Sequence, residues 1–150
     1  MSNTQAVCKN FRPDLLNGLH AFGTTVVRAG TGADTFKMAL FLATATINAD
    51  TATYSSTGEL AATGNYTAGG VAVTNGNAPS TTGGTGIVAF WTPSASVSWT
   101  NLTSSGAFDA CLLYNSTQGN KAVAVFTFGS QTVTAGNFSL NMPTNDLTTG

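Results

Sequence analysis

The side chain best suited to chemistry in this sequence is its single histidine, His20. A metal site would need further His, Cys or carboxylate ligands that converge on the imidazole, and only Cys8 and Asp14 lie near it in the sequence. If residues 11–23 form a helix, Asp14 lies six positions before His20, so the two side chains do not share one helix face. We therefore expect no metal site and interpret His20 as a structural residue at a helix end.

Other catalytic patterns are weak. A Ser–His–Asp or Cys–His arrangement stays open because such sites are assembled in space, but the chain has no G-x-S-x-G nucleophile elbow. A glycosidase needs two carboxylates across a cleft, and the presence of six acidic residues alone says nothing about such a pair. The glycine-rich residues 82–86 lack the Lys-Ser/Thr of a phosphate-binding loop. We predict a protein that is not an enzyme, with no catalytic residues and no cofactor.

The two cysteines, Cys8 and Cys111, are too few to form a disulfide framework in a chain of 150 residues. We interpret them as free thiols packed as small hydrophobic side chains. A bridge between them stays open at this stage.

Four aromatic residues could stack on sugar rings if they gathered on the surface: Tyr66, Trp91, Trp99 and Tyr114. Trp99 alternates with serine residues, which indicates that its ring points inward. Core packing is the preferred interpretation, and a receptor- or glycan-binding adhesin module is the alternative.

The composition argues against several classes of partner. Only 7% of the residues are charged, against about 25% in ordinary domains. The net charge is −1 and the basic residues are scattered, whereas nucleic-acid binding needs clustered Lys and Arg. The polar first residues carry no secretory signal pattern, and the longest apolar stretch, residues 38–43, is too short to span a bilayer. We expect no nucleic acid and no membrane partner, and a surface suited to packing among copies of itself.

The elements that must position these residues form one domain over residues 1–150. We predict a flexible arm over residues 1–10, a helix over 11–23, a β-sandwich over 24–143 and a tail over 144–150. Pro13 suits the first turn of the helix, and Gly23 suits its end. An apolar stripe along this helix (Leu15, Leu16, Leu19 and Phe22) would dock it onto the sandwich.

Short β-rich runs bounded by Gly, Pro and polar loops follow this helix. They cover residues 35–44, 71–74, 87–92, 96–100, 108–114, 121–128 and 138–142. This pattern predicts an all-β fold, an antiparallel β-sandwich or jelly-roll-like barrel with one short N-terminal α-helix. Residues 35–44 and 121–128 are apolar on both faces, so both faces must be covered. Cover by the chain's own helix and loops is preferred over cover by another subunit.

Several segments in this order resemble a family of small virion structural proteins of tailed bacteriophages. They are Phe11-x-x-Asp14-Leu15-Leu16-x-Gly18-x-His20, Thr35-Phe-Lys-Met-Ala-Leu-Phe41, Asn65-Tyr-Thr-Ala-Gly-Gly70, Leu112-Leu-Tyr-Asn115 and Lys121-Ala-Val-Ala-Val-Phe-Thr-Phe-Gly129. The resemblance covers nearly the whole chain and consists of packing and turn patterns, so it transfers no active site.

The resemblance implies a virion component assembled in the cytoplasm of a bacterial host. We expect a capsid decoration or cement protein that binds copies of itself and the major capsid protein or other virion proteins; a tail or head–tail junction protein is the nearest alternative. Asn10, Phe11, Arg12 and Tyr66 are the residues we predict to make assembly contacts.

Overall fold

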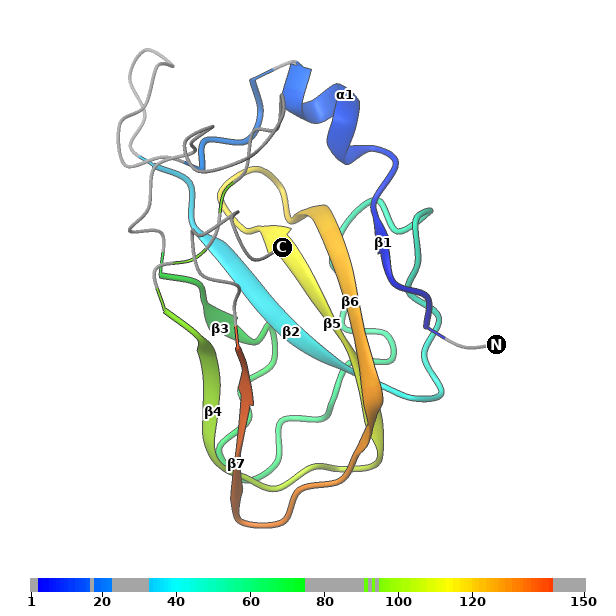
Figure 1. The fold of residues 1–150 in the computed structure, drawn as a ribbon, viewed down its shortest axis with the longest axis vertical. Helices are drawn as coiled ribbons and strands as arrows, with labels where there is room; N and C mark the ends of the chain where they lie inside the picture. The colour runs from blue at the N-terminus through cyan, green and yellow to red at the C-terminus, as the bar shows by residue number, and fades with distance from the viewer. Residues whose placement is uncertain are drawn as a thin grey trace, which may run out of the picture.

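The computed structural model describes residues 3–16, 18–22, 33–74, 91, 93 and 95–141 (Figure 1). Within these residues the chain forms one helix and seven strands. In chain order they are β1 (Ala6–Val7), α1 (Phe11–Leu16), β2 (Phe36–Leu42), β3 (Val71–Ala72), β4 (Val97–Leu102), β5 (Phe108–Asn115), β6 (Lys121–Gln131) and β7 (Gly136–Leu140).

The strands form two antiparallel sheets. The larger sheet has the order β1-β6-β5-β2-β3, and the smaller sheet pairs β4 with β7. The prediction of an all-β, sandwich-like fold with one short N-terminal helix is therefore confirmed. The larger sheet ends at β1 on one side and at β3 on the other, so the described strands do not close into a barrel.

The centre of the larger sheet is the β5–β6 hairpin, formed by the predicted runs over residues 108–114 and 121–128. Leu112 pairs with Val125, and the two strands are joined by the polar turn over residues 116–120. Gly119 and Asn120 turn the chain with positive φ angles of 64° and 59°, which glycine and asparagine tolerate better than other residues.

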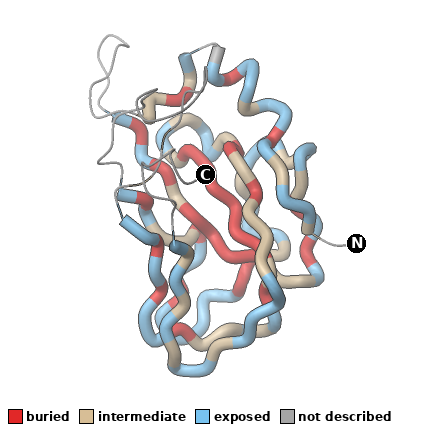
Figure 2. The backbone as a smooth tube through the Cα atoms, viewed as in Figure 1, coloured by how far each residue is buried: buried red, intermediate tan, exposed pale blue. Residues whose placement is uncertain are grey.

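Both faces of the larger sheet are covered by the chain itself (Figure 2). Along β2, Phe36, Met38 and Leu40 point into one buried cluster, whereas Ala39 and Phe41 point into another. The second cluster is completed by loop and N-terminal residues, namely Cys8, Ala45 and Ile47, with Phe11 and Tyr54 at its border. The preferred interpretation, cover by the chain's own segments, is confirmed.

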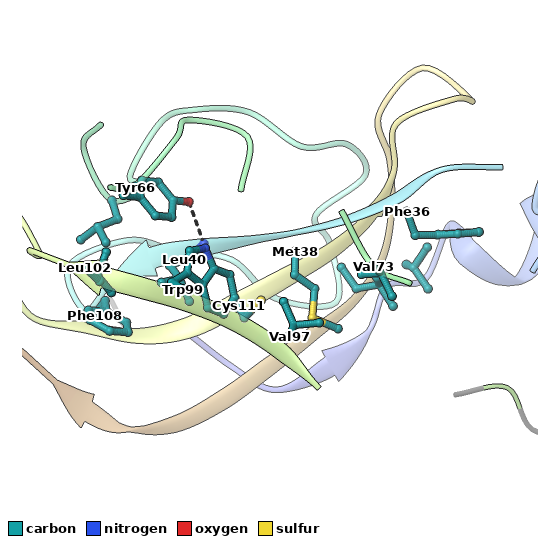
Figure 3. Packing of buried hydrophobic residues seen from close by; sticks show 13 residues of the cluster. Phe36, Met38, Leu40, Tyr66, Val73, Val97, Trp99, Leu102, Phe108 and Cys111 are labelled. Carbon is teal, nitrogen blue, oxygen red and sulfur yellow. Dashed lines mark hydrogen bonds between the residues drawn. The ribbon is translucent and has the colours of Figure 1, made fainter. Parts of the chain in front are cut away.

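The first cluster fills the space between the two sheets (Figure 3). Trp99 of β4 is 3% exposed and lies among these residues, so the prediction that it points inward is confirmed. Its ring and those of Phe108 and Phe128 surround Phe138 of β7, with centroid distances of 5.8, 5.0 and 5.2 Å. These aromatic contacts hold the small sheet against the large one.

The helix is shorter than predicted. It ends at Leu16, because Gly18 adopts a φ of 69° and the amides of Gly18 and Leu19 bond back to the carbonyls of Leu15 and Asp14. This pair of hydrogen bonds is a Schellman motif, which stops a helix. The predicted apolar stripe is therefore wrong: Leu15 is 47% exposed, and Phe22 packs on the core from outside the helix. Gly23 lies outside the described residues.

The prediction of a flexible arm is wrong over residues 3–10. The amides of Thr4 and Lys9 donate to the carbonyls of Ile47 and Ala49, and the amide of Cys8 donates to Val123 of β6. These bonds use the backbone, so they need no apolar side-chain pattern, which is why the polar sequence concealed them.

Two further predicted segments lie largely or wholly outside the described residues. Of the predicted strand over residues 87–92 only Trp91 is described, and the predicted tail over 144–150 lies outside the described residues.

Candidate functional site

His20 lies in a buried pocket of aromatic rings and amides, not at the helix end. Its exposed fraction is 7%, and its ring lies 5.1, 5.9 and 6.2 Å from those of Phe11, Phe22 and Phe36. The side-chain amide of Asn115 lies 3.0 Å from His20 Nδ1. Because an amide nitrogen only donates, Nδ1 is the acceptor of this bond.

Asn115 connects His20 to a second buried group, Asp34. Its Nδ2 lies 2.8 Å from Asp34 Oδ2, which also accepts the backbone N–H of Ala21 at 2.8 Å. Its Oδ1 accepts the amides of Thr117 and Gln118. The amide thus joins the end of β5, its following turn and the segments around residues 20 and 34. Asp34 and Asn115 were missed in the sequence, because nothing near them along the chain marks them as partners.

Glu59 forms a second polar cluster. The residue is 7% exposed, and its carboxylate accepts three hydrogen bonds: from Tyr54 OH at 2.6 Å, Tyr66 OH at 2.7 Å and the amide of Gly69 at 2.7 Å. Tyr114 OH donates to the carbonyl of Gly69 at 2.8 Å. These bonds tie the loop over residues 54–69 to strand β5.

The tyrosines of this cluster are held in their protonated form. Burial, and next the hydrogen bond to Glu59, raise the pKa of Tyr54 and Tyr66 above its ordinary value. Burial and then the charge of Glu59 raise the pKa of Tyr114. All three phenols act as hydrogen-bond donors to the fold. This role of Glu59 was not predicted, because its partners follow no regular spacing along the loop and meet only when the loop folds.

The two cysteines are free and fully buried, as predicted. Burial raises the pKa of the Cys8 thiol to about 11, and burial raises the pKa of Cys111 as well. A thiol that stays protonated at neutral pH is a poor nucleophile. Neither cysteine is placed for covalent catalysis.

The predicted assembly contacts are only partly accessible. Asn10 and Arg12 are exposed, and Phe11 is half-buried against both core clusters. Tyr66 is 3% exposed, and its hydroxyl accepts the amide of Leu40 at 3.0 Å (Figure 3), so it is a core residue and its assignment as an assembly contact is wrong. Tyrosine at a loop position had suggested exposure, but its ring fills the space beside β2.

Two large hydrophobic side chains are exposed in the same N-terminal stretch of the chain as Asn10 and Arg12. Among the described residues, Val7 and Leu15 are the large hydrophobic residues with high exposure, at 52% and 47%. They lie on β1 and α1, which follow one another at one side of the fold (Figure 1). We call the exposed residues of this stretch, Val7, Asn10, Arg12 and Leu15, the N-terminal patch. The sequence predicted its polar members but not Val7 and Leu15, which were assigned to an arm and to a buried stripe.

The aromatic residues considered for sugar binding do not form a surface platform. Tyr66, Trp99 and Tyr114 are at most 3% exposed, and Trp91 is half-buried and packs against the first cluster. The surface pocket lined by Phe41, Leu112 and several threonines, with a volume of about 410 Å³, contains neither a charged side chain nor a tryptophan or tyrosine. Stacking on a sugar ring therefore has no exposed partner in either place.

No three His, Cys, Asp or Glu side chains of the described residues gather in a way that could hold a metal ion. The same residues include no helix with the length and apolar character needed to cross a bilayer.

Comparison of the chain with protein-family models, with curated proteins and with solved structures gives no match. The function is therefore inferred from the residues and the geometry described above.

Proposed function

We propose that this protein is a non-enzymatic structural component of a bacteriophage virion, a decoration or cement protein that binds the coat lattice. The sequence resemblance supports a virion component, and the surface supports a binding role. The observation that carries the proposal is the N-terminal patch, where exposed Val7 and Leu15 accompany Asn10 and Arg12 on a nearly uncharged protein.

The disposition of the reactive groups favours this role over catalysis. His20, Glu59 and Cys111 each lie buried in the fold, and the first two are hydrogen-bonded to neighbouring segments. The hydrogen bonds of His20 and Glu59 therefore hold loops against the sheets, which suits a protein that acts through its shape. A repeated lattice multiplies each modest contact by the number of copies, so an interface on the order of 1,000 Å² per copy is enough to stabilise a shell.

The test is rebinding to virions from which the protein has been stripped. The variant Val7→Glu/Leu15→Glu places two charges on the N-terminal patch, and Ala62→Glu/Thr67→Glu places the same charges at two exposed loop positions as the control. We expect the control to co-sediment with the particles as the unmodified protein does and the patch variant to lose at least about tenfold in affinity. Equal binding of both variants would show that the N-terminal patch is not part of the interface.

The location of the bound protein decides between the two structural alternatives. Gold-labelled protein on the head supports a decoration role. Labelling confined to the tail or to the head–tail junction would replace the cement proposal with the tail alternative. A protein that binds no part of the particle would overturn both.

A further inference from the structure

Among the described residues, the smaller sheet of the sandwich has an open edge. It has two strands, β4 and β7, opposite the five strands of the larger sheet. β4 has neighbours on its outer side, because Leu102 bridges to Gly64 and β4 contacts β3. Across the described residues no strand pairs with the outer edge of β7 (Figure 1). A two-stranded sheet with an open edge is marginal in isolation.

The burial of inward-facing side chains falls from β4 to β7. Trp99 and Val97 of β4 are 3% and 4% exposed, whereas their cross-strand partners on β7, Phe138 and Leu140, are only half-buried. Both pairs of side chains point to the same side of the sheet. The higher exposure of Phe138 and Leu140 therefore shows that the described residues cover β7 less fully than β4. Figure 2 shows the same change from buried to partly exposed backbone.

The edge strand lacks two of the usual protections against pairing, charged side chains and proline. Natural edge strands are blunted by charged side chains or proline. β7 reads Gly-Asn-Phe-Ser-Leu and β4 reads Val-Ser-Trp-Thr-Asn-Leu, so neither strand carries a charge or a proline. The outward side chains of the sheet are small and polar, and the hydroxyls of Ser98 and Ser139 lie 2.8 Å apart.

We propose that β7 pairs antiparallel with β7 of a second copy across a two-fold axis. Such a contact brings identical residues of both copies together, which a charged edge would resist and this neutral edge permits. Pairing would join the two small sheets into one continuous sheet of four strands and would cover Phe138 and Leu140 at the seam. The inference deepens the proposed function, on which it rests for its biological setting, by assigning the surface through which copies associate.

A matched pair of variants tests the edge. Ser139→Lys and Ser98→Lys remove the same hydroxyl contact and add the same charge to the same exposed face, but only Ser139 lies on the edge strand. Sedimentation velocity should show a dimer for the unmodified protein and for Ser98→Lys. It should show dimerisation at least about tenfold weaker for Ser139→Lys, because the two introduced charges face each other. A monomeric unmodified protein, or equal dimerisation of the two variants, would overturn the inference.

Hydrogen exchange provides a second measurement that does not depend on how a variant folds. In the unmodified protein, amides of residues 136–140 should exchange more slowly at high concentration than at low concentration, because pairing protects them. Exchange independent of concentration would argue against pairing through β7.

The rebinding assay separates this inference from the proposed function. A monomeric protein that still binds stripped virions would overturn β7 pairing alone. A β7-paired dimer that binds no part of the virion would overturn the virion proposal and leave the pairing in place.

Discussion

Single residues in this protein hold loops in shape and join separate segments. Glu59 takes three donors from its own loop, and Asn115 links His20, Asp34 and the turn after β5. The sequence predicted the residues whose burial follows from local pattern, such as Trp99 and the free cysteines. It could not predict the roles of Glu59 or Asn115, because their partners are brought near by the fold and not by spacing along the chain.

Glu59→Gln should destabilise the fold. The amide keeps one acceptor oxygen but places an NH₂ group where a carboxylate oxygen accepted a bond, so a buried donor is left poorly paired. We expect the free energy of unfolding in urea to fall by about 1–3 kcal/mol.

The control for this substitution is Asp50→Asn. Asp50 pairs with Lys9 at the exposed surface, and such pairs contribute at most about 1 kcal/mol. A Glu59→Gln variant no less stable than this control would show that the cluster does not hold the loop.

Alkaline pH should unfold the protein. The pKa of Tyr54, Tyr66 and Tyr114 is raised in the folded state above the unfolded value, which is about 10. The unfolded chain therefore loses these protons first, so stability is complete below about pH 10 and falls as the pH rises above it.

Spectrophotometric titration of tyrosinate, followed together with circular dichroism, checks this expectation. Ionisation of the three tyrosines should coincide with loss of structure. Tyrosines that ionise with an ordinary pKa in a protein that stays folded would contradict the burial of their hydroxyls.

Strands were the most predictable elements and the helix the least. Short apolar runs bounded by Gly, Pro and polar loops predicted β2, β5 and β6, because a strand that is covered on both faces is apolar along nearly its whole length. The helix was predicted too long because Gly18 can either be tolerated inside a helix or end it, and only the tertiary contacts decide. The segment β1 was missed since its pairing with β6 uses backbone groups.

Gly70 controls how β3 meets β2. Its φ is 70°, and a Cβ at this position would lie 1.8 Å from the carbonyl oxygen of Met38. Gly70→Ala must therefore push the two strands apart, and we expect it to cost at least about 3 kcal/mol of unfolding free energy.

Gly119 offers the matched control. It also has a positive φ, 64°, but an added Cβ would meet nothing within 4 Å. Gly119→Ala should thus cost only the conformational term of about 1–2 kcal/mol. Equal losses for the two variants in thermal or urea unfolding would mean that the close approach at Gly70 is unimportant.

The whole molecule combines a self-covered sheet with a surface that carries few charges. Both faces of the larger sheet are buried by the chain itself, so the covered faces are not the binding surfaces. Among the described residues, the N-terminal patch and the open edge of β7 are the surfaces that we propose for partners. Only 7% of the residues in the chain are charged. Electrostatic repulsion between copies of the protein, or between it and neighbouring proteins, is therefore weak.

The most direct measurement is the melting of the shell itself. Virions stripped of this protein, and the same virions after it has been added back, are heated in a calorimeter, and the temperature of shell disruption is recorded. A cement role predicts that adding the protein back raises this temperature and that the Val7→Glu/Leu15→Glu variant does not. A shell that melts at the same temperature with and without the protein would contradict that role.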